Sequence, residues 1–414
     1  MSKIIELLSE KIHLKKELIE NWFNQKFQET PALFYNSTDL RHNNTKIAPI
    51  DTNCFPAGFN NLSIESHKEA SKVSLEFFNQ NFPQAKKILI IPENHTRNLR
   101  YLENIFSLHQ ILSTHKEVKV GTLIDDITQE TAFETEKKNI ITLNPIKKQK
   151  DRIVTQDGFE ADIIILNNDL TDGIPEILKN ITTTVIPSTL MGWHSRTKSA
   201  HFDIYNQLAQ ELAQILEIDP WLISSIHRSC HEVNFKEQIG LDCLANYVDQ
   251  IITLLREKYK EHNIEGDPYC YIKADNGTYG IAVWPVSSGK EVMEINKKER
   301  NKMNMLKGSV QNTQVMIQEG IPTQDKIDNK IAEPMIYLIN GKVVGNLFRV
   351  NEDRDEKISL NAAGATFCDL SELKEEQTNI SSDKNRMAVV YSLISRLAAL
   401  AAAVENRNAL IRNE

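Results

Sequence analysis

Short apolar runs recur along the chain between residues 84 and 200, and their length is typical of buried strands. Residues 101–112, between the first two runs, have the spacing of a helix. Strands that alternate with helices form a parallel sheet. We therefore expect a small parallel α/β domain, with strands at residues 88–91, 118–123, 140–143, 163–166 and 184–187.

Other segments have the period of a helix or the form of a β-hairpin. Apolar positions fall on one face of residues 2–27, which predicts a packing helix. Residues 333–351 hold two apolar runs around Asn340-Gly341, a pair that suits a type I′ turn. Residues 269–284 hold two runs around a polar turn and also predict a hairpin. Further helices are expected at residues 204–216, 235–259, 287–307 and 387–404.

Residues 39–62 have no hydrophobic period, and we expect a polar loop there. Arg41 and Lys46 can hold a carboxylate, and amide side chains such as Asn53 and Asn60 can orient an amine. Prolines and phenylalanines in the same stretch favour a rigid loop. A substrate pocket and a purely structural loop both stay open, because loops serve either purpose.

Polar clusters follow two of the expected strands, at the sheet edge where α/β proteins bind ligands. Residues 92–98, which include Arg97, follow the first strand, and residues 167–173 follow the fourth. Beyond the fifth strand, Arg196 and Lys198 add positive charge to the same expected mouth. Each cluster taken alone can also be a helix cap.

Composition and charge narrow the class of protein. The 414 residues are 41% hydrophobic and 25% charged, which indicates a soluble globular protein of two or three domains. The net charge of -8 argues against nucleic acid as the main partner. Five scattered cysteines without a CxxC spacing favour reduced thiols in the cytoplasm. We expect neither a signal peptide nor a membrane span, since charges interrupt every apolar stretch.

The hairpin at residues 269–284 carries the clearest candidate chemistry. Lys273 closes its first run, and Gly277 and Gly280 let backbone N–H groups face one concavity, which suits an anion. A lysine beside such a turn is typical of phosphate binding, although the P-loop spacing is absent. An ordinary glycine-containing hairpin with a surface lysine remains the alternative.

A second candidate, for a metal, is weaker. His227 and His231 are four residues apart and would chelate an ion from one helix. No HExxH-type motif accompanies them, so we favour a structural role.

The order of these pieces resembles the ATP-grasp superfamily, in which two antiparallel layers hold the nucleotide. More closely, the chain is similar to the small proteobacterial type of glutamate–cysteine ligase, over nearly its whole length. The resemblance rests on four motifs: residues 51–62 (DTNCFPAGFNNL), 191–194 (MGWH), 273–280 (KADNGTYG) and 360–364 (LNAAG).

The resemblance implies ATP-dependent joining of L-glutamate, through its γ-carboxylate, to the amine of L-cysteine. The product would be γ-glutamylcysteine, the first intermediate of glutathione synthesis. Phosphorylation by ATP would give the carboxylate a competent leaving group, and the protein would position reactants and neutralise charge. Mg²⁺ is expected at the phosphates.

The resemblance also implies roles for individual residues. Lys273 would contact the ATP phosphates, and Arg349 would stabilise the transferring phosphoryl group. Glu333 and Asn361 would bind magnesium; Ser359 stands where the superfamily usually has a second acid, for which Asp353, Asp355 or Glu356 are substitutes. The remaining nucleotide contacts would come from Gly277, Thr278 and Gly280 in the cover and from Gln318 and Glu319 at the hinge. The glutamate contacts, chosen by chemical type, are Arg41, Lys46, Asn53, Asn60, Arg97 and Arg196.

The overall expectation is an α/β (α+β) enzyme in three parts. Residues 1–83 would form an N-terminal helix and substrate loop, 84–200 the parallel domain, and 201–414 an ATP-grasp domain with antiparallel sheets. Two alternatives stay open: another ATP-grasp carboxylate–amine ligase, such as one making glutathione, and a nucleotide-binding module without activity. The sequence is compatible with a homo-oligomer and does not decide the oligomeric state.

Overall fold

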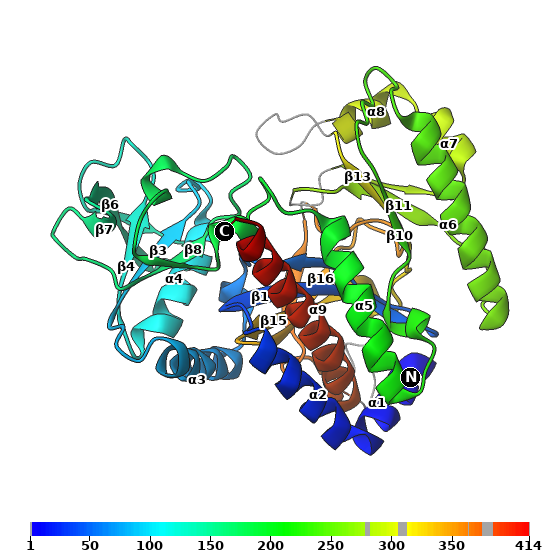
Figure 1. The fold of residues 1–414 in the computed structure, drawn as a ribbon, viewed down its shortest axis with the longest axis horizontal. Helices are drawn as coiled ribbons and strands as arrows, with labels where there is room; N and C mark the ends of the chain where they lie inside the picture. The colour runs from blue at the N-terminus through cyan, green and yellow to red at the C-terminus, as the bar shows by residue number, and fades with distance from the viewer. Residues whose placement is uncertain (1, 278–281, 305–312, 363, 375–383, 414) are drawn as a thin grey trace.

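The computed structural model describes residues 2–277, 282–304, 313–362, 364–374 and 384–413, and arranges them around three sheets. In Figure 1 the parallel sheet lies on one side, the sheet with β11 and β13 on the other, and the sheet with β1 and β15 between them. Helix α9 (Lys384–Asn413) crosses the centre of the molecule in Figure 1 and packs against the strands of the middle sheet. This mixed architecture confirms the predicted fold class.

The first sheet contains all five predicted parallel strands. Its order is β5-β6-β4-β3-β8-β9, where β5 is antiparallel at one edge and β7 pairs with β6. Helix α4 packs against one face of this sheet, and α3 packs against α4 and the neighbouring middle sheet, so that all of them share one core. The bounds are β3 Lys87–Pro92, β4 Glu117–Thr122, β5 Thr131–Glu134, β6 Ile140–Gln149, β7 Arg152–Thr155, β8 Ile163–Asn167, β9 Thr184–Ile186, α3 Ile64–Asn81 and α4 Leu99–Ser113.

The middle sheet is antiparallel and joins the two ends of the chain. Its order is β17-β16-β15-β1-β2, with β14 paired to β15. The bounds are β1 Tyr35–His42, β2 Ile47–Asn53, β14 Lys326–Ile327, β15 Lys330–Ile339, β16 Lys342–Val350 and β17 Thr366–Asp369. The hairpin predicted at residues 333–351 is confirmed as β15 and β16.

The N-terminal part of this sheet corrects one expectation. Much of the loop expected at residues 39–62 consists of the strands β1 and β2, and β1 pairs with β15. Their polar side chains hid the pattern, because several of them face cavities instead of an apolar core. Residues 1–83 therefore share a sheet with the C-terminal part of the chain, and the three-domain division stays a prediction.

The third sheet, of order β10-β13-β11-β12, carries the lysine hairpin, which is confirmed as β11 and β12. The bounds are β10 His227–Cys230, β11 Cys270–Ala274, β12 Val283–Val286, β13 Val315–Glu319, α6 Leu241–Glu261, α7 Gly289–Met293 and α8 Lys297–Asn304. Two helix predictions need correction: the helix expected from residue 235 begins at Leu241, and the charged helix expected at 287–307 is divided into α7 and α8.

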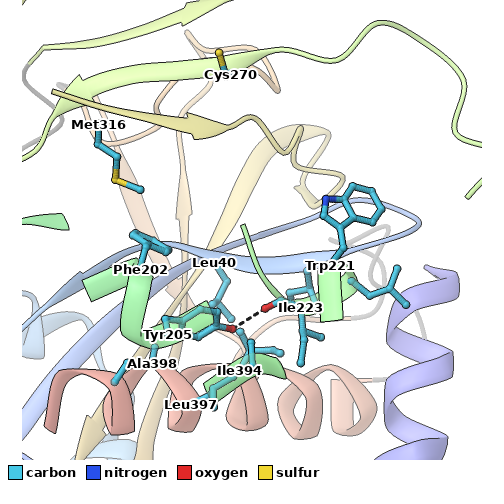
Figure 2. Close-up of a cluster of buried hydrophobic side chains, with 14 of the residues drawn as sticks. Leu40, Phe202, Tyr205, Trp221, Ile223, Cys270, Met316, Ile394, Leu397 and Ala398 are labelled. Atoms are coloured by element: carbon cyan, nitrogen blue, oxygen red, sulfur yellow. Dashed lines mark hydrogen bonds between the residues drawn. The ribbon is translucent and has the colours of Figure 1, made fainter. Parts of the chain in front are cut away.

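Helices α1, α2, α5 and α9 cover one face of the middle sheet, and the largest apolar core lies between them and the sheet. The helix expected at residues 2–27 is two helices that meet at Lys15. In Figure 2, Tyr205 of α5 lies between Leu40 of β1 and the α9 residues Ile394 and Leu397, and its hydroxyl donates to the Ile223 carbonyl. The bounds are α1 Lys3–Leu14, α2 Lys16–Glu29, α5 Lys198–Leu216, η1 Phe59–Asn61, η2 Glu176–Leu178, η3 Thr189–Met191 and η4 Pro220–Ile223.

Helix α9 is long and apolar enough to cross a membrane, but its most apolar stretch is 72% buried inside the fold. It packs against α5 and α1 and against the strands of the middle sheet. Its hydrophobicity is therefore that of a core helix.

Candidate active site

Two adjoining cavities lie on the open face of the middle sheet. The first, of about 560 Å³, lies between this sheet and the ends of the parallel strands. The second, of about 80 Å³, lies between the middle and third sheets. Four residues line both cavities: Asp39, Asp51, Arg349 and Asn361. We call these four residues the junction.

A row of alternating charges crosses the middle sheet at the junction. Asp39 and Arg41 are two residues apart on β1, and Glu333 of β15 pairs in register with Arg349 of β16. Glu333 accepts from Arg41 Nε at 2.9 Å and from Arg349 Nη1 at 2.6 Å. Arg349 Nη1 also donates to Asp39 Oδ2 at 2.8 Å. We call Arg41, Glu333, Arg349 and Asp39 the charge row; their mutual contacts fix both guanidinium groups.

The neighbouring charges shift the pKa of Asp39. Burial raises the pKa of its carboxyl, Arg349 lowers it, and the nearby Glu333 and Asp51 raise it again, so that the net change is upward. Asp51 behaves oppositely: burial disfavours its charge, but the ammonium groups of Lys198 and Lys273 lower its pKa to about 2.

The third sheet contributes Lys273 to the second cavity. Its ammonium group donates to the Ile50 carbonyl at 2.7 Å and to Gln318 Oε1 at 2.5 Å. Burial and the neighbouring Lys198 lower the pKa of Lys273 to about 7. Lys198, at the start of α5, donates to Asp51 at 2.6 Å. Two ammonium and two guanidinium groups thus line a small cavity together with three carboxylates, Asp39, Asp51 and Glu333, and the excess of cations suits an anion.

Most of the residues expected to contact the nucleotide or metal come together here. Lys273, Gly277, Gln318, Glu333, Arg349 and Asn361 line the second cavity, as does Arg41, which was expected at glutamate. Asn53 and Asn60 line the first cavity. Thr278 and Gly280 lie outside the described residues.

Four expected contacts lie outside both cavities. Lys46 and Glu319 are buried against each other, with 2.8 Å between Lys46 Nζ and Glu319 Oε1, and line neither cavity. Arg196 is buried and binds Glu405 through two nitrogens, and Arg97 is exposed in the loop after β3. The residue types were compatible with ligand binding, but partners distant in sequence have taken up the first three charges.

The sequence analysis did not select three residues that line the second cavity: Asp39, Asp51 and Lys198. The alternation of Asp39 with Arg41 was the available signal, because residues two apart on a strand share a face. Lys198 had been noted only as added charge near the sheet mouth.

The histidine pair does not form a chelate. His227 lies on strand β10, not on a helix, and its Nε2 is 3.1 Å from Asp203 Oδ1. His231 is exposed beyond the end of that strand. The preference for structural roles is consistent with this placement.

The donor groups near Asn361 fit a magnesium ion. Each carboxylate oxygen of Glu333 accepts one guanidinium hydrogen bond, which leaves a lone pair on each oxygen. Asn361 adds an amide oxygen in the same cavity, and Ser359 adds a hydroxyl. Magnesium needs only one or two protein oxygens when phosphates and water complete its shell. The proposed substitutes Asp353, Asp355 and Glu356, as the structure describes them, line neither cavity.

Comparisons with known proteins identify the relatives of this chain. A sequence model of the glutamate-cysteine ligase family matches residues 9–406. A protein from Methylobacillus flagellatus KT, assigned as a gamma-glutamylcysteine synthetase, is 34% identical, with a TM-score of 0.88 over 100% of this chain and 97% of that one. The comparison with curated proteins gave no significant match.

Two other solved structures are more distant. D-alanyl-alanine synthetase A from Vibrio cholerae is 11% identical, with a TM-score of 0.35 over 75% of this chain and 80% of that one. A glutathione synthetase-like effector from Globodera pallida is 9% identical, with a TM-score of 0.38 over 89% and 81%. TM-scores this low do not show a shared fold.

Proposed function

This chain belongs to the glutamate–cysteine ligase family, and from that premise we propose how its two cavities divide the reaction. The enzyme is an ATP-dependent ligase that joins L-glutamate to L-cysteine as the first step of glutathione synthesis. We assign the ATP phosphates to the second cavity and the amino acids to the first. The observation that supports this division is the junction, where Arg349 lines both the first cavity and the second, which holds three further cationic side chains.

The chemistry requires that the glutamate γ-carboxylate be activated before an amine attacks it. A γ-carboxylate oxygen attacks the γ-phosphorus of ATP, the bond to the bridging oxygen breaks, and ADP leaves with that electron pair. The neutral amine nitrogen then attacks the acyl phosphate carbon, phosphate leaves with the electron pair of its C–O bond as the C–N bond forms, and the nitrogen loses a proton. Protein groups contribute by alignment and by neutralising the charge on the transferred phosphoryl group.

The cations of the second cavity are placed for this task. Lys273 and Lys198 approach from the third sheet and from α5, and Arg41 and Arg349 approach from the middle sheet. Arg349 reaches the junction, so we assign it to the phosphoryl group and the acyl phosphate. Arg41 is held by Glu333, by the Tyr271 hydroxyl and by backbone carbonyls, so we assign it to supporting Glu333 instead of binding glutamate.

We assign magnesium binding to Glu333 and Asn361. A bound magnesium ion would offset phosphate charge and orient the γ-phosphate. The two guanidinium groups on Glu333 already hold its carboxylate in one orientation, which favours a defined ligand geometry.

The first cavity has the chemistry of an amino-acid site. Asn53 and Asn60 line it together with Trp193, His95 and Arg100. We retain Asn53 and Asn60 as glutamate contacts. The first expected alternative, a different carboxylate–amine ligase, is not favoured, because the family match names cysteine as the amine.

Three expectations remain predictions about the protein's setting. Free cysteines throughout the described residues support a reducing compartment, and we propose the cytoplasm. We also propose that the partners are small molecules, without nucleic acid or membrane. A homo-oligomer stays a prediction.

The test measures phosphate release from ATP and Mg²⁺ with glutamate, cysteine or both, and identifies the product by mass. We expect release that depends on both amino acids and a γ-glutamylcysteine mass. Lys273→Ala should raise the KM for ATP about 10- to 100-fold, the effect of losing one charged hydrogen bond. Lys342→Ala, an exposed lysine paired with Glu76, is the matched control and should leave that KM unchanged. An unchanged KM in Lys273→Ala would refute the assignment of the second cavity.

A further inference from the structure

The two aspartates of the junction have no role in the scheme above. We propose that Asp39 and Asp51 bind the ammonium group of the amine substrate beside the activated carboxylate, and that one of the two carboxylates accepts the proton that this group loses before its nitrogen attacks. This inference rests on the proposed function, because it requires an acyl phosphate beside Arg349.

The arrangement of the two carboxylates points to a cation. Asp39 of β1 and Asp51 of β2 are directly opposite each other in the antiparallel register. Like charges in this position destabilise a sheet. Both residues line both cavities, so the pair faces the passage between ATP and the amino acids. A positively charged substrate group at this point would relieve the repulsion.

Each aspartate has an oxygen available for such a group. Asp39 Oδ2 accepts from Arg349, and Asp51 Oδ1 accepts from Lys198 and from the Thr52 N–H. Asp39 Oδ1 and Asp51 Oδ2 have no hydrogen-bond partner in the described part of the chain. Arg349 Nε, in a side chain that is 5% exposed, also lacks a partner there. A polar ligand at the junction would therefore find two open acceptors.

The position favours the attacking amine over the α-ammonium group of glutamate. The attacking nitrogen must lie about 3–3.5 Å from the acyl carbon, which we place at Arg349. Asp39 lies 2.8 Å from Arg349 and, unlike Glu333, also lines the first cavity, to which we assign the amino acids. The α-ammonium of glutamate is separated from its γ-carboxylate by two methylene groups and the α-carbon, so it lies deeper in the first cavity.

Hydroxylamine provides the decisive comparison. It is largely uncharged at neutral pH and traps an acyl phosphate as a hydroxamate, so it needs no ammonium site. Asp39→Asn keeps the shape of the side chain and removes its charge. We expect its KM for cysteine to rise about 10- to 100-fold. Glutamate- and ATP-dependent hydroxamate formation should fall far less, because the asparagine oxygen can still accept the hydrogen bond from Arg349. Asp51→Asn should raise the cysteine KM by a smaller factor, since Lys198 already holds one oxygen.

A matched control and the opposite outcomes complete the test. Asp203→Asn makes the same chemical change at an exposed aspartate that lines neither cavity, and should alter neither reaction. Equal loss of ligation and hydroxamate formation in both aspartate variants, or a raised KM for glutamate in place of cysteine, would overturn the ammonium site. Failure of the wild-type enzyme to form any hydroxamate would instead refute the acyl phosphate of the proposed function.

Discussion

Replacing Lys46 by methionine separates a structural lysine from a substrate-binding one. The ammonium group of Lys46 lies 2.8 Å from Glu319 Oε1 and 4.0 Å from the centre of the Trp221 ring. The other Glu319 oxygen accepts from Trp221 Nε1 and the Ile226 N–H. Both side chains are at most 2% exposed. The substitution therefore leaves a buried carboxylate without its cation.

The expected cost is large compared with the stability of a typical protein. Removing one partner of a buried ion pair costs about 3–5 kcal/mol, against a total of about 5–15 kcal/mol. We expect urea denaturation, followed by circular dichroism, to show this loss in Lys46→Met. Because Lys46 lines neither cavity, the variant that remains folded should keep the wild-type KM for glutamate.

The double variant Lys46→Met/Glu319→Gln is the matched control. It removes both charges and keeps a glutamine oxygen for Trp221 and Ile226, so it should lose less stability than Lys46→Met alone. A tenfold or larger rise in the KM for glutamate in Lys46→Met, without loss of stability, would refute this reasoning and restore Lys46 as a substrate ligand.

Three further predictions follow from the charges and turns described above. Lys273 has a pKa of about 7 in the free protein, and bound phosphate favours its charged form. Above that pH, ATP binding should therefore take up protons, and the affinity for ATP should fall as the pH rises. Calorimetry in two buffers of different ionisation enthalpy checks this, and buffer-independent heats would contradict it. Arg349→Lys keeps the charge but loses the planar guanidinium group that contacts Asp39 and Glu333. In steady-state kinetics kcat should fall about 10²- to 10³-fold, with little change in the KM for ATP. A kcat near the wild-type value would count against a role of Arg349 in phosphoryl transfer. Gly341 has φ +68° in the β15–β16 turn, where a Cβ would lie 2.9 Å from Phe27. Gly341→Ala should therefore lower the free energy of unfolding by about 1–2 kcal/mol. An unchanged midpoint of urea denaturation would show that the turn is not constrained.

The hydrophobic pattern was enough to predict the parallel sheet and the two hairpins. Those elements bury apolar faces whose residues are close together in sequence, so their periodicity is local. The pattern failed at β1, whose side chains face the cavities and whose partner is distant: Arg41 and Glu333 are 292 positions apart. The pairing of such strands depends on the whole fold.

The same dependence on distant parts of the chain explains which of the predicted residues line the cavities. Lys273 and Gly277 were predicted because a glycine turn beside a lysine has a local signature. Lys46 and Arg196 were misassigned because a charged residue type does not tell whether its partner is a ligand or a buried carboxylate. Their carboxylates, Glu319 and Glu405, lie 273 and 209 positions away.

Stability alone does not account for the charge row. Buried ion pairs are often no more stabilising than well-packed apolar residues of similar volume, because desolvation offsets their attraction. The row also places Glu333 between two arginines and Asp39 opposite Asp51, arrangements that fix several charges in one orientation. Fixed charges stabilise a transition state without reorganising as the reaction proceeds. Because the row ends at the passage between the cavities, its cost in stability is best explained as preorganisation: Arg349 is already oriented when the γ-carboxylate and the phosphate arrive.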